Sequence, residues 1–265
     1  MDMQYTEKCK IYFIGAGPGD PELLTVKAYK ILSASGCVFY AGSLINKELL
    51  KIPSSDCIFY DMSGMCFEEI AEKIEMMYDA GTITSVLHAG DSSLYSSISE
   101  QAALLEIKQA NYEIIPGVTA AFAACASNKS TLTLPDVSQT VIFCRAAGRT
   151  GKLPDGQDIK SLASHKATMA IYLSFGLIDS VVSDLLESYD ENTYCLIAKD
   201  VSLKSEILIE CKLKDVLNIA KAKSIKNMAV LLVGNALAGK YSIDHKSKLY
   251  DENFFHTFRK AKKSR

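Results

Sequence analysis

Apolar runs alternate with amphipathic segments through the first half of the chain. The β-branched and aromatic runs at 10–15, 38–40, 57–60, 82–87 and 112–115 are typical of buried strands. Helical patterns follow them from 21 and over 47–50, 67–78, 98–109 and 120–126. In the pattern 67–78, Phe67, Ile70, Ile74 and Met77 fall on one face. Strands separated by helices predict a mostly parallel sheet that is covered on both faces.

The second half has a different pattern. Strands are expected at 141–144, 168–173, 193–198, 206–210 and 228–233, and the segment between 198 and 206 is too short for a helix. That short connection favours an antiparallel pair within a mixed sheet. A polar linker at 128–136 with Pro135 separates the halves. The fold class is therefore α/β, with domains at 9–128 and 137–240 and a polar, basic tail at 241–265.

Composition and charge narrow the possible functions. The 265 residues are 48% hydrophobic, enough for a large core, and 29 basic against 31 acidic residues give a net charge of −2. No overall basic field exists to attract nucleic acid. The chain has no apolar run of about 18 residues, and residues 1–8 are polar. We therefore expect a soluble, cytoplasmic protein that binds neither membrane nor nucleic acid.

Cysteine and histidine spacing gives no sign of a metal site. The eight cysteines are scattered singly, mostly in or beside apolar runs, and none of the four histidines has ligand spacing. Such cysteines are typical of small buried apolar residues in a reducing cytoplasm. We expect no protein-bound metal.

The first strand ends in a turn that looks like a nucleotide-binding loop. Gly15, Gly17 and Gly19 form GxGxG, whereas a dinucleotide fingerprint has GxGxxG and an acidic residue after the second strand. Pro21 is placed as a first helical residue without an N–H, and Asp20 as an N-cap that occupies the remaining donors. A phosphate needs those donors free. The turn therefore argues against a dinucleotide site.

Two further strand-end loops carry candidate binding groups. In His88-Ala-Gly-Asp-Ser-Ser-Leu-Tyr95, the small residues allow a ligand to approach the backbone, and Asp91 either faces a ligand or caps a helix. In Ile115-Pro-Gly-Val-Thr-Ala120, Thr119 is placed to bind a ligand or to cap the next helix. Loops at the carboxyl ends of parallel strands line the ligand crevice of an open sheet.

These three loops resemble the signature loops of the tetrapyrrole (uroporphyrin and corrin) methyltransferases. The likeness extends over residues 9 to 237. Two further segments, Tyr40-Ala-Gly-Ser-Leu44 and Leu134-Pro-Asp-Val-Ser-Gln-Thr-Val141 with the following Arg145-Ala-Ala-Gly-Arg-Thr150, are similar to the branch that methylates C11 of precorrin-4 or cobalt-precorrin-4. The resemblance implies a homodimer that holds S-adenosylmethionine in a cleft between its domains, with S-adenosylhomocysteine as product. The cofactor residues that it implies are Pro18, Ala89, Gly90, Asp91, Leu94, Thr119, Ala120, Leu173, Asn235, Ala236 and Leu237.

The chain departs from the family at two places. Ser92 stands where members usually have proline, and Lys199-Asp-Val-Ser-Leu203 replaces a segment of the Arg-Ala-Ser-Trp-Pro type. The contribution of this second segment to the cofactor pocket is left open.

Arginine usage points to the substrate. The chain has four arginines, and two of them, Arg145 and Arg149, flank a short loop after the strand 141–144. A planar guanidinium binds carboxylates with two parallel hydrogen bonds, which lysine does not reproduce. The pair therefore either grips the carboxylates of a tetrapyrrole or forms surface salt bridges.

The sequence thus predicts an enzyme that transfers a methyl group from S-adenosylmethionine to a tetrapyrrole. Because the sulfonium is already activated, alignment and exclusion of water are expected to matter more than a nucleophilic side chain. Asp91 and Tyr95 are the candidate catalytic residues. Three alternatives remain: methylation at another position (C2 and C7 of uroporphyrinogen III, or C20 of precorrin-2), a nucleotide-binding oxidoreductase, and a binding module with a degraded site.

Overall fold

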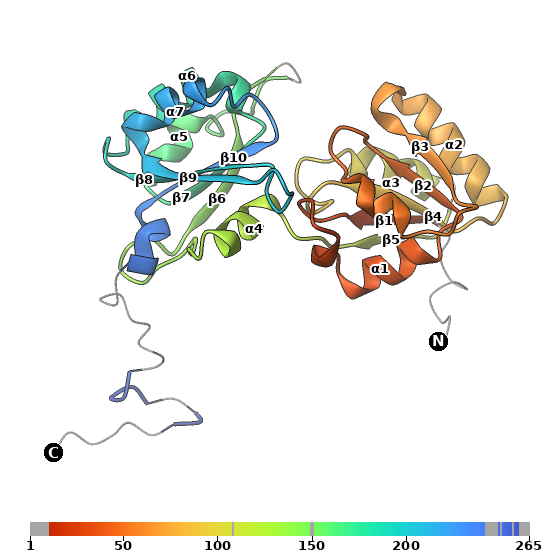
Figure 1. Ribbon diagram of the computed structural model, residues 1–265, viewed down its shortest axis with the longest axis horizontal. Coiled ribbons are helices and arrows are strands. Elements are labelled where there is room, and N and C mark those ends of the chain that lie inside the picture. Colours follow the sequence, from red (N-terminus) through yellow and green to blue (C-terminus); the bar gives the residue numbers. More distant parts are fainter. Residues whose placement is uncertain are drawn as a thin grey trace. The chain divides into compact units, whose positions relative to one another are not determined.

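The computed structural model describes residues 11–107, 109–148, 151–241, 249, 251–255 and 257–259 (Figure 1). Contacts divide the chain into two compact units. The first is Met1–Ala123 with Asp200–Ser205, and the second is Ala124–Lys199 with Glu206–Arg265. The domain limits expected from the sequence stay a prediction beside this division, and most of the expected tail 241–265 lies outside the described residues.

A fully parallel sheet forms the centre of the first unit. Its strands are β1 (Ile11–Gly15), β2 (Cys37–Tyr40), β3 (Ile58–Asp61), β4 (Thr84–His88) and β5 (Tyr112–Ile115). They lie in the order β3-β2-β4-β1-β5, and every pair is parallel. The predicted parallel sheet is confirmed.

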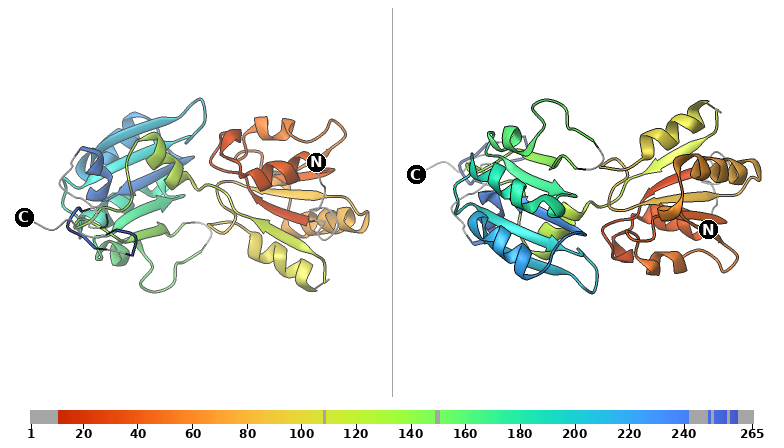
Figure 2. Two further views of the ribbon diagram at one scale, coloured as in Figure 1. Left: turned by 90° about the horizontal axis from the view of Figure 1, so that it is seen from below. Right: turned by 90° about the horizontal axis from the view of Figure 1, so that it is seen from above.

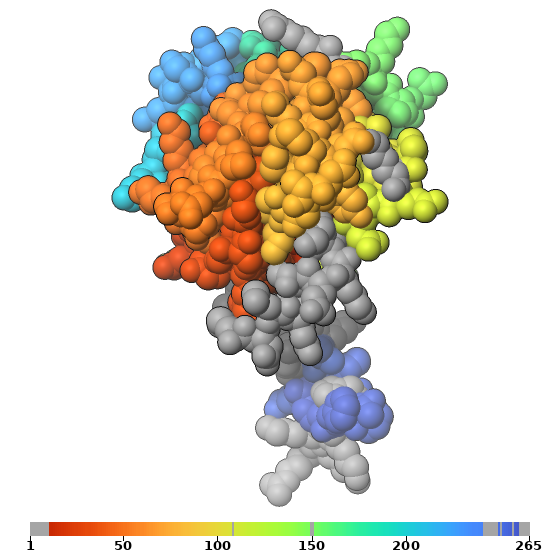
Figure 3. Space-filling model, turned by 90° about the vertical axis from the view of Figure 1, so that its right-hand side faces the viewer, coloured from red at the N-terminus to blue at the C-terminus, as the bar shows by residue number. Residues whose placement is uncertain are grey.

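Helices cover both faces of this sheet. The alternation along β1 sends Tyr12 and Ile14 to the face covered by α1 (Val26–Ser33) and η2 (Lys47–Lys51), and Ile11 and Phe13 to the face covered by α2 (Phe67–Asp79) and α3 (Ile98–Ile107). In Figure 3 the orange to gold atoms, a range that includes α2, lie on the face of this unit that is turned to the viewer. A strand buried on both faces is apolar throughout, as β1 is.

The prediction that the first α-helix begins at Pro21 is wrong. Pro21–Leu23 is a short 3-10 helix (η1), Leu24 is extended, and α1 begins only at Val26. Thr25 makes this second start possible because its hydroxyl accepts the Ala28 N–H at 3.2 Å. The expected helix at 47–50 is likewise a 3-10 segment, η2. A third such turn, η3 (Met62–Gly64), follows β3.

A mixed sheet forms the centre of the second unit. Its strands are β6 (Val141–Arg145), β7 (Thr168–Tyr172), β8 (Tyr194–Lys199), β9 (Ile207–Lys212) and β10 (Ala229–Val233). Their order is β6-β7-β10-β8-β9, with β6 and β7 parallel and the other pairs antiparallel. The mixed sheet and the antiparallel pair at its edge are confirmed.

Helices α5 (Ile159–Ala163), α6 (Ile178–Leu186) and α7 (Val216–Ala222) pack over one face of the second sheet. The C-terminal half of α4 (Ala120–Ser127) lies on the other side (Figures 1 and 2). Short 3-10 turns complete the unit: η4 (Phe175–Leu177), η5 (Leu213–Asp215) and η6 (Asn235–Tyr241).

Candidate cofactor site

The loops after β1 and β4 are joined by backbone hydrogen bonds at the carboxyl edge of the first sheet. The Ala16 N–H donates to the His88 carbonyl at 2.7 Å. Gly17 and Gly90 exchange two further bonds, of 3.0 and 2.7 Å. Both glycines have positive φ, +73° and +70°, which only glycine adopts readily. The two loops therefore form one rigid rim.

Glycines also bring the loop after β5 into this rim. A Cβ on Gly117 would lie 2.1 Å from the Gly90 carbonyl oxygen and 2.7 Å from the Gly15 carbonyl carbon. A Cβ on Gly15 would lie 2.5 Å from the Gly117 nitrogen. Because these neighbours are backbone atoms, they cannot give way as a flexible side chain would. The close approach of three strand ends explains why glycine stands at each of these positions.

Asp91 links two of the loops. Its Oδ2 accepts the Gly117 N–H at 2.8 Å, and its Oδ1 accepts the Ser93 N–H at 2.8 Å and the Ser93 hydroxyl. Partial burial favours the neutral acid, but the hydrogen bonds from Ser93 and Gly117 outweigh it and lower the pKa of Asp91. A carboxylate with both oxygens bound and a lowered pKa is a weak base. The geometry therefore favours a role in positioning, and a catalytic role for Asp91 stays a prediction.

The other candidates in the first unit lie around the same rim. Ala89 is exposed, Pro18 and Leu94 are half-buried, and Tyr95 is 41% exposed with φ at +55°. An exposed aromatic residue in the left-handed region carries strain, a feature that concentrates at functional sites. Thr119 is buried, and its carbonyl accepts two N–H groups at the start of α4, which begins at Ala120.

Sequence reasoning gave no role to two buried polar residues beside the rim. His88, at the end of β4, is 8% exposed and packs near the Phe13 ring, with centroids 6.0 Å apart. Among the described residues, none forms a hydrogen bond with its buried Nε2. Burial lowers the pKa of His88 to about 4, so the ring is neutral at physiological pH. Ser92, at the position where proline is usual, is fully buried. An apolar strand running directly into a polar residue was the available signal for His88.

The candidates in the second unit fall at two opposite edges of its sheet. Arg145 ends β6 and pairs in register with Tyr172, so it shares an edge with Leu173. Leu173 is 72% exposed and has φ at +53°. Arg145 donates a long bond, 3.5 Å, to the Ala146 carbonyl. Arg149 lies outside the described residues.

Asn235, Ala236 and Leu237 follow β10, which runs antiparallel to β7. Because Val233 pairs with Met169 and Leu231 with Ile171, these residues lie at the other end of the strands from Leu173. The Asn235 Oδ1 accepts the Tyr194 N–H at 3.1 Å, while Ala236 and Leu237 have no exposed surface. Their assignment to the cofactor stays a prediction.

Comparisons with known proteins agree with this geometry. Residues 10–217 match the profile of the tetrapyrrole (corrin/porphyrin) methylases. The chain belongs to this family. It is 42% identical to a cobalt-precorrin-4 C(11)-methyltransferase of Methanocaldococcus jannaschii, over 96% of this chain and 97% of that protein.

Two solved structures of the family are similar in fold. A cobalt precorrin-4 methyltransferase has a TM-score of 0.83 and 35% identity, covering 86% of this chain and 95% of that one. Uroporphyrin-III C-methyltransferase from Thermus thermophilus, in complex with S-adenosylhomocysteine, has a TM-score of 0.71 and 24% identity, covering 86% of this chain and 99% of that one. The chain described here is therefore a methyltransferase of this family, with two α/β units.

The turn after β1 does not suit a dinucleotide phosphate. As expected, Asp20 caps the helical turn after β1: its Oδ1 accepts the Glu22 N–H at 2.9 Å, and Pro21 occupies the first position. Those donors are not open to a phosphate. Ala89 is exposed and the adjacent Gly90 has no side chain, and the approach of a ligand to the backbone here stays a prediction.

Within the part of the chain that the structure describes, no helix has the length and apolar character to cross a bilayer. No group of three or more metal-ligating side chains gathers among those same residues.

Proposed function

We propose that this chain transfers the methyl group of S-adenosylmethionine to C11 of precorrin-4 or cobalt-precorrin-4 in corrin biosynthesis. The observation that carries the proposal is the 42% identity, over almost the whole length of both chains, to a relative named for that reaction. The local segments 40–44 and 134–141 support the same branch of the family.

Methyl transfer from a sulfonium requires the protein to align the reactants and does not require a nucleophilic side chain. A methyl sulfonium reacts in line with an approaching carbon once the two are held together and water is removed. The bonded rim of Gly17, Gly90 and Gly117 supplies a rigid support, and Asp91 fixes two of its loops to each other. Tyr95 carries an exposed hydroxyl-bearing side chain four residues after Asp91. We assign it a role at the reacting face.

The position of Arg145 supports the proposal that the substrate is acidic. This residue ends a strand at the same sheet edge as the exposed Leu173, and its guanidinium suits the acetate and propionate groups of a tetrapyrrole. Arg149 is proposed as its partner from the sequence.

The test is turnover with defined substrates. Purified protein is incubated with S-adenosylmethionine and either cobalt-precorrin-4, precorrin-4 or uroporphyrinogen III, and the product is examined by mass spectrometry and by NMR with a 13C-labelled methyl group. A new methyl group on C11 supports the proposal. A methyl group on another carbon assigns the chain to another branch, and tight binding of NAD in place of S-adenosylhomocysteine would overturn it.

We further propose that the enzyme is a cytoplasmic homodimer without a resident metal. The homodimer rests on the resemblance to the family. Light scattering of the purified protein tests the dimer, and elemental analysis tests the absence of metal.

A further inference from the structure

The connection between β8 and β9 belongs by its contacts to the first unit, although both strands belong to the second. We call this connection, Asp200–Ser205, the clasp loop. The Ser202 hydroxyl accepts the Asp20 N–H at 2.8 Å, a contact between residues 182 positions apart. The clasp loop therefore holds the turn after β1, which carries Pro18 and the helix cap.

Leu203 packs where Gly19 lacks a side chain. A Cβ on Gly19 would lie 2.6 Å from the Leu203 Cδ2, 2.8 Å from its Cγ and 3.2 Å from the Val201 carbonyl oxygen. Val201 itself is only 5% exposed. Gly19 and Leu203 are thus complementary in shape, and each limits the positions open to the other.

The clasp loop keeps a strained backbone to make these contacts. Asp200 and Ser202 have φ at +50° and +63°, in the left-handed region that residues with a side chain rarely adopt. The Leu203 N–H donates to the Asp200 carbonyl at 3.0 Å and closes the turn. Such strain persists only where surrounding contacts impose it, and it concentrates at functional segments.

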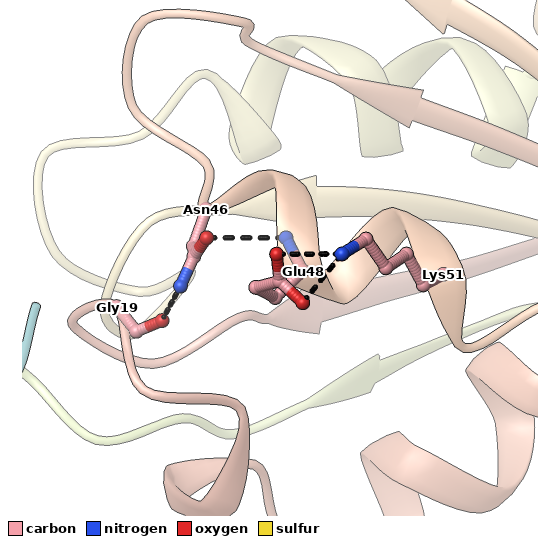
Figure 4. A network of polar contacts seen from close by, with 4 residues as sticks. All are labelled: Gly19, Asn46, Glu48 and Lys51. Atoms are coloured by element: carbon pink, nitrogen blue, oxygen red, sulfur yellow. Dashed lines mark hydrogen bonds and ion pairs between the residues drawn. The ribbon is translucent and has the colours of Figure 1, made fainter.

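The same turn is held from another element as well. The Asn46 Nδ2 donates to the Gly19 carbonyl at 2.8 Å, and the Asn46 Oδ1 accepts the Glu48 N–H at 3.1 Å (Figure 4). Lys51 in turn pairs with Glu48 at 2.7 Å. The Gly19 carbonyl and the Asp20 N–H are therefore fixed by two separate segments of the chain.

We propose that Ser202 and Leu203 of the clasp loop are positioning residues, which hold the turn 15–20 in the conformation that receives S-adenosylmethionine. Both residues lie in the segment 199–203, where the sequence of this chain departs from that of the family. The proposal rests on the proposed function, because it assumes that this turn forms part of the cofactor site.

Ser202→Gly and Leu203→Ala test the clasp, and Ser205→Ala in the same loop is the matched control. Glycine tolerates the left-handed backbone but removes the hydroxyl acceptor, so the Asp20 N–H loses its partner. We expect each test variant to raise the Kd of S-adenosylhomocysteine about five- to thirty-fold by calorimetry, with the melting temperature nearly unchanged. The control should bind like the wild type.

A double-mutant cycle tests the contact between Gly19 and Leu203, and hydrogen exchange tests the clasp without the ligand. Gly19→Ala should weaken binding through its clash with Leu203, and Leu203→Ala should relieve part of that loss, so that the double variant is better than additivity requires. Amide exchange in a peptide covering 15–25 should be faster in Ser202→Gly and Leu203→Ala than in the control. Unchanged exchange and unchanged affinity would overturn the clasp. A folded wild type that does not bind S-adenosylhomocysteine would instead overturn the proposed function, while exchange still reports on the clasp.

Discussion

The two sheets have equal numbers of strands but arrange their candidate site residues differently. In the first sheet all strands run in one direction, so the ends of β1, β4 and β5 meet at one edge, and their loops are bonded to one another. In the second sheet β10 runs against β7, so Leu173 and Asn235 lie at opposite edges. Strand direction therefore decides whether residues after different strands can join in one site.

The rim of the first unit depends on backbone contact. It brings the main chains of Gly15, Gly90 and Gly117 so close that no side chain fits between them. In the second unit, a Cβ on Gly148 or Gly176 would meet nothing within 4 Å. Alanine should therefore destabilise the protein at the close-packed rim glycines and be tolerated at glycines such as Gly176, whose Cβ would meet no other atom within 4 Å.

Gly117→Ala should have the largest effect. Its Cβ would overlap the Gly90 carbonyl oxygen, and neither backbone can move without breaking the loop contacts. We expect a loss of about 3 kcal/mol or more of the free energy of unfolding, with no measurable binding of S-adenosylhomocysteine. Gly176→Ala is the control and should leave both near wild type. Chemical denaturation and calorimetry measure the two quantities; equal stability of the two variants would contradict the close-packed rim.

Acid should destabilise the protein through His88 in the first unit. The pKa of His88 is about 4 in the folded protein against 6.5 when it is free, so between these values the unfolded state binds more protons. Stability is therefore full above pH 6.5 and falls as the pH drops toward 4, by about 3 kcal/mol. Denaturation curves across this range measure the effect. His88→Asn should flatten the profile, whereas His165→Asn, at an exposed position of the second unit, should not.

Arg145→Lys tests the substrate edge of the second sheet. Lysine keeps the charge but loses the bidentate geometry, so the KM for the tetrapyrrole should rise about five- to a hundred-fold, a loss of roughly 1–3 kcal/mol. The Kd of S-adenosylhomocysteine should stay unchanged, because Arg145 is assigned to the substrate and not to the cofactor. Steady-state kinetics and calorimetry separate the two effects. An unaltered KM would leave the acidic substrate resting on the family alone.

Leu173→Ala and Asn235→Ala should have the smallest effects. Together they test which end of the strands of the mixed sheet faces the cofactor. Leu173 is an exposed, strained residue, whereas the Asn235 Oδ1 already accepts a backbone N–H. We expect Leu173→Ala to raise the Kd of S-adenosylhomocysteine about five-fold, on the order of 1 kcal/mol. Asn235→Ala should lower the melting temperature, because the Asn235 Oδ1 holds the Tyr194 N–H. A raised Kd in Asn235→Ala with an unchanged Kd in Leu173→Ala would place the cofactor at the Asn235 end of the strands.

The limits of sequence reasoning appear in particular elements. The strands were predicted well because burial on two faces demands continuous apolar runs, as in β1. The helix start at Pro21 was predicted wrongly because Asp20 and Thr25 are both good caps, and sequence alone does not say that each begins its own helix. His88 was missed as a buried group because its burial arises from Phe13 on another strand.

The sequence by itself determined the α/β class, the change from parallel to mixed sheet, the capped turn that excludes a phosphate, and the family. Each of these depends on local periodicity, on connection length or on short motifs. Only the tertiary structure decided that Asp91 joins two loops, that Leu173 and Asn235 lie at opposite edges, and that Ser202 reaches Asp20. Those outcomes depend on strand order, direction and register, which are set by packing between residues far apart in the chain and leave no periodic signal in it.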